Sequence, residues 1–352
     1  YGENHPHVAS GLNTLAQLLH ASNRLTEAEP LMRRALQIDE HSYGENHPII
    51  ANRLYNLASL LRTTNRLAEA EPLMRRALTI SEQSHGRNHP DVAIRLKGLA
   101  SLLTTTNRLV EAEPLMRRAL AITEANFGPN HPDVAIVLNN LAGLLQDTNR
   151  FVDAEALYRR ALTIDEQVYG ENHPDIAIDL NNLAQVLQAN NRWKEAEPLI
   201  RRALEIDEQS YGENHPAVAT LLNSLANLLQ NTNRLEEAEP LYRRALKSDE
   251  QSYGENHPSV AIRLNNLAML LQATNRLADA EPLMRRALDI YLSFFRAAGH
   301  QHPHLQRVIN NYAGMLQAMG SGPEEIRGKI AELGKHHGVV FGGAGGQAGS
   351  GP

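Results

Sequence analysis

The sequence repeats itself every 42 residues, and this period constrains the fold more than any other feature. The dipeptide His-Pro marks seven equally spaced positions, from His5-Pro6 to His257-Pro258, and an eighth pair, His302-Pro303, follows after 45 residues. The sequence between these His-Pro pairs is nearly the same each time, so seven full repeats and one divergent repeat fill residues 1 to about 341. A fixed period of this length is typical of proteins that stack one small structural unit many times.

The first part of each repeat predicts a helix, which we call helix A. Leu54, Leu57 and Leu61 fall on one stripe of a helix. We expect this helix to begin at Pro48, because proline suits the first helical position, with the preceding histidine as the N-cap. It should end near Asn65, because asparagine can adopt the left-handed conformation that closes a helix.

The second part predicts another helix, helix B, which ends at Gly86. Its apolar stripe contains two alanines seven residues apart, Ala70 and Ala77, which recur in every full repeat. A larger residue there would hold neighbouring helices apart. One helical hairpin cannot bury its apolar stripe alone, so each pair must pack on the next, and the expected fold class is all-α.

Composition limits the function classes. A formal net charge of -6 over 352 residues gives no general attraction to nucleic acid or to an anionic membrane, and we predict neither partner. The absence of cysteine fits a cytoplasmic location, and no apolar run is long enough to span a bilayer. Because the chain starts with Tyr1 inside the repeated motif, we expect it to be a piece of a longer polypeptide.

The pattern "HPxVAxxLNNLAxLL" followed by "AEPLxRRALxI" resembles the tetratricopeptide repeat, and the 42-residue spacing resembles the long subclass found in kinesin light chains and bacterial repeat proteins. Leu54 and Ala58 stand where the standard repeat has Trp and Gly. The resemblance implies a right-handed superhelical solenoid of sixteen helices in antiparallel pairs. We expect seven repeats in residues 1–294, a divergent capping repeat in 295–341, in which Glu325 replaces an alanine, and a flexible Gly-rich tail in 342–352.

The resemblance also implies where a ligand would bind, because in this family the A helices line a concave groove that holds an extended or helical peptide. Side-chain amides on helix A can pair with any peptide backbone, so the groove would be permissive in sequence. Kinesin light chain repeats use helix A asparagines in this way, and the matching positions here are Asn139, Asn140, Asn181, Asn182, Asn265 and Asn266. The candidate peptide-binding residues are Asn139, Gln146, Asn181, Gln188, Asn223, Asn227, Gln230, Asn265, Gln272, Tyr55, Arg62 and Lys97.

Two alternatives remain for these residues. The amides could bridge neighbouring helices or face water instead of binding a ligand. Tyr55, Arg62 and Lys97 differ from the amide pattern, so they could hold an acidic group or a C-terminal carboxylate, or belong to a solvated face.

The sequence gives no reason to expect a metal, a cofactor or an enzyme. The histidines of the His-Pro pairs stand one repeat apart and are expected to share no centre. His300, His302, His304, His336 and His337 form a denser group, but without a carboxylate or cysteine partner. The Arg pairs of helix B, such as Arg75-Arg76, are expected to form ion pairs with Glu71 and its equivalents, and no catalytic constellation or phosphate loop is readable.

The sequence therefore predicts a scaffold that binds a protein or peptide along the A helices. The alternative is an architectural spacer, or a module that forms homo-oligomers through its terminal repeats. A third hypothesis is an array that senses a ligand for an enzymatic domain elsewhere in a longer protein.

Overall fold

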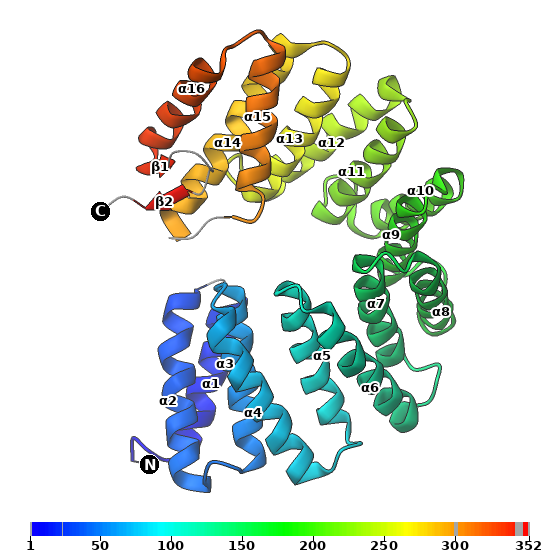
Figure 1. Cartoon of the computed structure of the whole chain (residues 1–352). Coiled ribbons are helices and arrows are strands. Elements are labelled where there is room, and N and C mark those ends of the chain that lie inside the picture. Colours follow the sequence, from blue (N-terminus) through cyan, green and yellow to red (C-terminus); the bar gives the residue numbers. More distant parts are fainter. Residues whose placement is uncertain (1, 23, 299–301, 342–347, 351–352) are drawn as a thin grey trace. The chain divides into compact units, whose positions relative to one another are not determined.

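A computed structural model describes residues 2–22, 24–298, 302–341 and 348–350. The chain divides into two compact units, an N-terminal unit of residues 1–171 and a C-terminal unit of residues 172–352. In each unit, helices follow one another in antiparallel pairs, with the odd-numbered helix of a pair as helix A and the even-numbered one as helix B (Figure 1). The predicted all-α solenoid of paired helices is confirmed.

Where the structure describes it, the N-terminal unit contains four helix pairs. Its helices are α1 (Pro6–Ala21), α2 (Leu25–Tyr43), α3 (Pro48–Thr63), α4 (Leu67–His85), α5 (Pro90–Thr105), α6 (Leu109–Phe127), α7 (Pro132–Asp147) and α8 (Phe151–Tyr169). Each helix packs on the other helix of its pair, and α2, α4 and α6 also pack on the A helix of the next pair.

The described residues of the C-terminal unit form four further pairs and two short strands. Its helices are α9 (Pro174–Ala189), α10 (Trp193–Tyr211), α11 (Pro216–Asn231), α12 (Leu235–Tyr253), α13 (Pro258–Ala273), α14 (Leu277–Ala298), α15 (Leu305–Ala318) and α16 (Pro323–His336). The strands β1 (Val339–Phe341) and β2 (Ala348–Ser350) pair antiparallel, with Val339 opposite Ser350.

The helix ends lie where the sequence predicts them. Proline occupies the first turn of α3, and the side chain of His47 caps this helix by accepting a hydrogen bond from the backbone N–H of Ile49 at 3.3 Å. Asn65 adopts φ 59° after α3, and Gly86 adopts φ 86° after α4. The left-handed region is reached at low cost by glycine and asparagine, so these residues stop the helices.

Small and straight-chain residues fill the core. Ala70 and Ala77 are fully buried on α4, and Leu54, Leu57 and Leu61 are buried on α3. Burying each leucine stabilises the fold by roughly 1.5–3 kcal/mol relative to an exposed one. The first repeat differs, because Leu15 and Leu18 of α1 are 49% and 65% exposed, whereas their equivalents Leu57 and Leu60 are buried.

The end of the chain differs in part from the prediction. The insertion after Phe294 lengthens α14 to 22 residues before the next His-Pro pair. We expected no regular structure in residues 342–352, but residues 348–350 form β2, while residues 342–347 and 351–352 lie outside the described residues.

Candidate functional site

Three A helices of the C-terminal unit, α11, α13 and α15, are joined by hydrogen bonds between asparagine amides. Asn223 and Asn265 are 9% and 4% exposed. The Nδ2 atom of Asn266 donates to Oδ1 of Asn223, and that of Asn311 donates to Oδ1 of Asn265, each at 2.8 Å. Asn265 in turn donates to Asn266 at 3.3 Å. We call Asn223, Asn265, Asn266 and Asn311 the amide ladder. At Asn223 and Asn265 the structure thus shows amides that bridge neighbouring helices.

In the N-terminal unit the same two positions are filled in different ways. Asn56 donates to Asn13 at 3.3 Å, so α3 and α1 carry one rung of the same kind. At the next boundary the pair is Tyr55 and Gly98, and a Cβ atom on Gly98 would lie 2.5 Å from the Tyr55 ring. A large residue on α3 therefore faces the smallest residue on α5, and Tyr55 packs between helices.

Two of the predicted carboxylate-binding residues, Tyr55 and Arg62, contact the neighbouring helix α5. The guanidinium of Arg95 lies 4.5 Å from the Tyr55 ring centroid, and Arg62 donates to the Ser101 hydroxyl at 2.7 Å. Lys97 is half-buried on α5, and this burial lowers its pKa. These contacts tie Tyr55 and Arg62 of α3 to α5.

Arg95 is a buried cation that sequence analysis missed. It is 6% exposed and donates to the Asn52 side chain, and burial lowers its pKa. The equivalent Arg53 pairs with Asp39 at 2.7 Å, but the position of Asp39 holds Ser81 in the next repeat. A comparison of the two repeats in the sequence would have identified Arg95 as an arginine that lacks the aspartate of the preceding repeat.

A hollow of about 270 Å³ opens on the A-helix face of the N-terminal unit, between α5 and α7. It is lined by Ser101, Thr104, Thr105, Met116, Asn139, Asn140, Gly143, Leu144 and Asp147. We call it the α5–α7 hollow. The predicted residue Asn139 belongs to it, whereas Gln146 is half-buried nearby in sequence on α7. A Cβ atom on Gly143 would lie 3.5 Å from the Tyr158 hydroxyl.

The remaining predicted amides lie on α9, α11 and α13. Asn227 and Gln230 accept hydrogen bonds from the hydroxyl of Tyr242, the latter at 2.9 Å, and the burial of this tyrosine raises its pKa. Asn181, Gln188 and Gln272 are half-buried. The buried oxygens Oδ1 of Asn181 and Oε1 of Gln272 have no hydrogen-bond partner among the described residues.

Ion pairs form within and between successive B helices, and the predicted pairing of Arg75 with Glu71 is confirmed, whereas Arg76 pairs with a different glutamate. Glu71 accepts from Arg75 of its own helix and from Arg108 at the start of the next B helix, both at 2.7 Å. Burial acts to raise the pKa of Glu71, but the hydrogen bonds from the two arginines outweigh it and hold that pKa below its usual range. Arg76 pairs with Glu40 of the preceding repeat at 2.7 Å.

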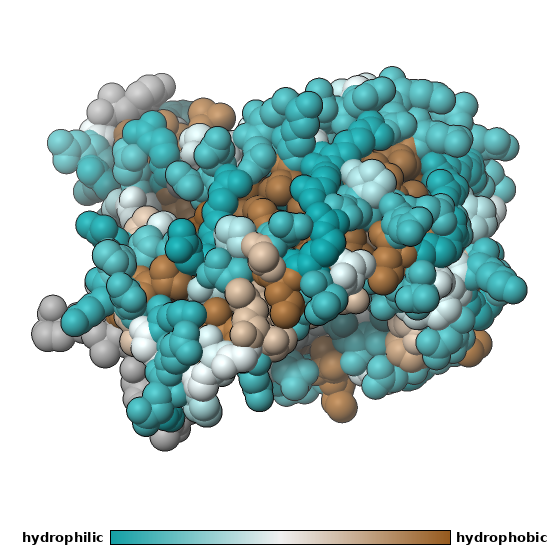
Figure 2. All heavy atoms as spheres, turned by 90° about the horizontal axis from the view of Figure 1, so that it is seen from above, coloured by the Kyte–Doolittle hydropathy of each residue, from teal (hydrophilic) through white to brown (hydrophobic). Residues whose placement is uncertain are grey.

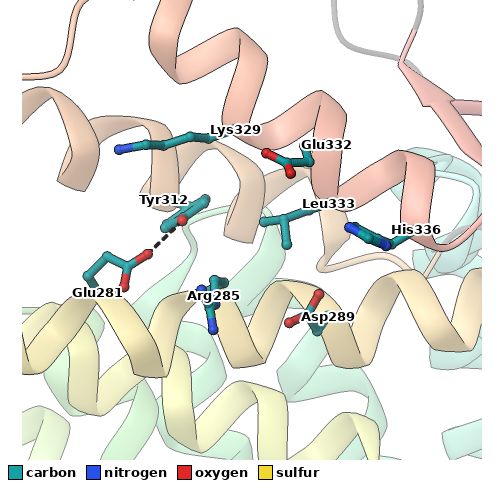
Figure 3. Close-up of a pocket in the computed structure, with 8 residues that line it drawn as sticks. All are labelled: Glu281, Arg285, Asp289, Tyr312, Lys329, Glu332, Leu333 and His336. Carbon is teal, nitrogen blue, oxygen red and sulfur yellow. Dashed lines mark hydrogen bonds between the residues drawn. The ribbon is translucent and has the colours of Figure 1, made fainter.

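A cavity of about 520 Å³ lies between α14, α15 and α16 in the divergent eighth repeat and the helix before it (Figure 3). Its lining includes Glu281, Arg285 and Asp289 of α14, Tyr312 of α15, and side chains of α16 (Figure 3). The Tyr312 hydroxyl donates to Glu281 at 2.7 Å, in place of the arginine pair that the equivalent glutamates of α4 and α6 form. Elsewhere the face shown in Figure 2 is mostly hydrophilic, with apolar patches separated by polar side chains.

The histidines near the end of the chain serve different contacts. His300 lies outside the described residues. The Nδ1 atom of His302 accepts from the backbone N–H of His304, and His337 lies 3.3 Å from Asp289. Among the described residues, one group of three potential ligand side chains is close enough to hold a metal ion. It consists of His85, His89 and Asp91, and the sequence did not predict it.

Comparisons with known proteins agree with the repeat architecture. The family model described as "Tetratricopeptide repeat" matches residues 7–83, 54–125, 99–167, 133–209, 175–251 and 218–293, which together cover most of the chain. No sequence among the curated proteins matches. No helix in the described part of the chain combines the length and apolar character that crossing a bilayer requires.

Solved structures with a similar fold include repeat arrays of the kinesin light chain kind. A Podospora anserina putative kinesin light chain with nearly identical TPR-like repeats is 21% identical, with a TM-score of 0.52, over 59% of this chain and 98% of that one. BtubC (BKLC) from P. vanneervenii is 24% identical, with a TM-score of 0.52, over 69% and 93%. The apo quorum sensor NprR from B. thuringiensis is 12% identical, with a TM-score of 0.65, over 93% and 88%. With its family-model matches and its paired helices, this chain belongs to the tetratricopeptide repeat family.

Proposed function

We propose that this protein-interaction scaffold binds an extended segment of a partner polypeptide across the faces of its A helices, and that it acts by binding without catalysing a reaction. The observation that carries the proposal is the α5–α7 hollow in the N-terminal unit. Helices α5 and α7 leave space there on the A-helix side, because Gly143 has no side chain.

The chemistry of the hollow suits a peptide. Met116 and Leu144 supply apolar surface, while Thr104, Asn139 and Asn140 supply donors and acceptors. A site that combines an apolar floor with a few polar groups fixes one side chain of a ligand and pairs with its backbone. We therefore expect the occupant to be an extended peptide with one small or medium apolar side chain over Gly143.

Because of the amide ladder, we expect other asparagines than Asn223 and Asn265 to recognise the ligand. Asn223 and Asn265 are buried in interhelical hydrogen bonds, so replacing them would weaken the packing of α11, α13 and α15 before it affected a ligand. Asn140 is exposed and lines the hollow. The proposal therefore places recognition at Asn139 and Asn140, and it keeps the amides of α9, α11 and α13 as a further proposed surface in the C-terminal unit.

The test is to select peptides from a displayed random library on the chain and to measure their Kd for variants of the hollow. Gly143→Gln introduces the residue that α9 has at the same position, Gln185, and should fill the hollow without disturbing the helix. We expect the selected peptides to bind this variant at least about tenfold more weakly, which corresponds to about 1.4 kcal/mol.

The matched control is Gln185→Ala, which changes the same repeat position on α9 and should leave the Kd unchanged. Circular dichroism verifies that both variants are folded. If no peptide is selected, or if the selected peptides bind Gly143→Gln as tightly as the unmodified chain, the proposed groove is wrong.

A further inference from the structure

The boundary between α4 and α5 brings two histidines and an aspartate together. His85 is the last residue of α4, His89 caps the start of α5, and Asp91 lies in the first turn of α5. The Oδ2 atom of Asp91 is 3.9 Å from Nδ1 of His85 and 3.7 Å from Nδ1 of His89. One ligand atom from each of the three residues lies within 4.8 Å of the other two.

The repeat geometry explains why these side chains meet. Gly86 turns the chain sharply at φ 86°, and the cap at His89 fixes the start of the next helix. At four other boundaries this turn stacks an aromatic ring on the capping histidine, as in Tyr253 on His257, with ring centroids 4.4 Å apart. In this repeat the aromatic position holds His85, so the same turn stacks one imidazole on another at 4.7 Å.

From this arrangement we propose that His85, His89 and Asp91 form a binding site for a divalent transition-metal ion, with Zn²⁺ as the expected occupant. Two imidazoles and one carboxylate suit Zn²⁺, and three protein ligands with a water in the fourth position are a common zinc coordination. A tetrahedral ion with bonds of about 2.0–2.1 Å separates its ligand atoms by about 3.4 Å. The observed separations of 3.7 and 3.9 Å are somewhat longer, and the ligand atoms of the two histidines lie within 4.8 Å, so binding an ion requires the stacked imidazoles to turn until a nitrogen of each ring points at it.

The surroundings allow that adjustment. The side chains of His85, His89 and Asp91 are 32%, 41% and 42% exposed, so an ion can enter and the side chains can turn. The Nδ1 atom of His89 accepts a hydrogen bond from the backbone N–H of Asp91 at 3.2 Å, and a bound ion would replace this bond. Because the ion ties the end of α4 to the start of α5, binding should stabilise this boundary by mass action.

The sequence prediction missed this site for an identifiable reason. It compared histidines one repeat apart, whereas the second imidazole comes from the position four residues before the His-Pro pair. That position holds Tyr43, Phe127 and Tyr211 in other repeats, so His85 is the departure that marks the site.

The experiment titrates the full chain with Zn²⁺ by calorimetry and with Co²⁺ by visible absorption, which reports nitrogen and oxygen ligation directly. His85→Tyr restores the residue of most other boundaries and keeps the ring stack. Asp91→Ser introduces the residue that α13 has there, Ser259. We expect each variant to lose one binding equivalent, or to bind Zn²⁺ at least about tenfold more weakly.

A gain-of-function variant distinguishes Zn²⁺ binding by this cluster from Zn²⁺ binding by other histidines of the chain. Phe127→His should build a second copy of the cluster between α6 and α7, where His131 already lies 3.6 Å from Asp133. It should therefore add one Zn²⁺ equivalent. The proposal is overturned if His85→Tyr leaves the stoichiometry, the affinity and the Co²⁺ spectrum unchanged, with circular dichroism confirming that the variants are folded.

Discussion

The seventh and eighth repeats follow the same template, but their B helices pack differently. In α14, Ala280 and Ala287 are completely buried. In α16 the equivalent positions hold Glu325 and Glu332, which are exposed, and Gly334 is the buried residue of this helix. A carboxylate is costly to bury without a partner, so α16 keeps its glutamates in water and the cavity of about 520 Å³ lies beneath it (Figure 3). Small residues on helix B therefore decide how closely a repeat can pack.

The boundaries that lead into these two repeats also differ in the side chains that close them. Between α12 and α13, Arg263 and Asp249 form a buried ion pair at 2.8 Å. Between α14 and α15, the equivalent positions hold Val308 and Tyr291, which are 1% and 0% exposed. The same place in the repeat can thus be closed by a charge pair or by apolar side chains, provided that both partners change together.

Transferring the eighth repeat's glutamate into a regular repeat should have the largest effect. Ala245 of α12 is fully buried beside Val218 and Leu222, at the position equivalent to Glu332. Ala245→Glu would overpack this cluster and bury an unpaired carboxylate, so we expect a loss of about 4 kcal/mol or more in the free energy of unfolding. Guanidinium unfolding followed by circular dichroism measures it. A loss below about 1 kcal/mol would show that helix spacing does not depend on the alanines.

Breaking the buried ion pair should have the next largest effect. Asp249→Ala leaves Arg263 buried without its carboxylate, and we expect a loss of about 3–5 kcal/mol in the free energy of unfolding. Replacing both residues by their equivalents in the eighth repeat, as Arg263→Val with Asp249→Tyr, should cost less than the single change, because no buried charge remains. A double variant less stable than Asp249→Ala would contradict this view of the boundary.

The sequence was sufficient to predict the helices, because each is marked by residues with strong backbone preferences, such as Pro48, Asn65 and Gly86. It also predicted the close contacts at Ala70 and Ala77. It was not sufficient for the site, because the role of an amide depends on which side chain faces it from the next helix. That facing residue stands 43 positions away in the Asn223 and Asn266 pair, and the sequence alone does not fix this register.

Several site residues illustrate the same limit. Tyr55 is a predicted ligand-binding residue, and its contact with α5 depends on the absence of a side chain at Gly98. The α5–α7 hollow also depends on a glycine, Gly143, which carries no chemical signal of its own. By contrast, His85 was visible in the sequence as a departure from an aromatic position, and only its distance to Asp91 needed the structure.

The boundary between α10 and α11 has the aspartate without the arginine, so we expect its stability to depend on pH. Asp207 takes the position of Asp249, but Leu221 replaces the arginine, and burial raises the pKa of Asp207 to about 6. The folded carboxyl holds its proton more tightly than the unfolded one, whose pKa is near 3.9. The folded state therefore gains stability as the pH falls from 7 through 6 toward 4, and loses it as the pH rises.

For this group we expect a change of roughly 2–3 kcal/mol in the free energy of unfolding between pH 7 and pH 4. Asp207→Asn should remove this contribution and raise the stability at pH 7. Unfolding curves of the two proteins at several pH values provide the measurement, and parallel pH profiles would contradict the assignment to Asp207. Leu221→Arg supplies the missing partner and should lower the pKa of Asp207 instead.

The smallest effect is expected from the reverse exchange in the eighth repeat. Glu332→Ala removes an exposed carboxylate, so we expect a change within about 0.5 kcal/mol in the free energy of unfolding, in contrast to the large loss for Ala245→Glu. With Glu325→Ala added, both alanine positions of the template are restored, and α16 should move closer to α14 and α15. Hydrogen exchange of the α16 amides would then slow, because closer packing raises the free energy of local opening. If exchange stays unchanged in the double variant, something other than the two glutamates keeps the cavity open, and the contrast between the seventh and eighth repeats needs another cause.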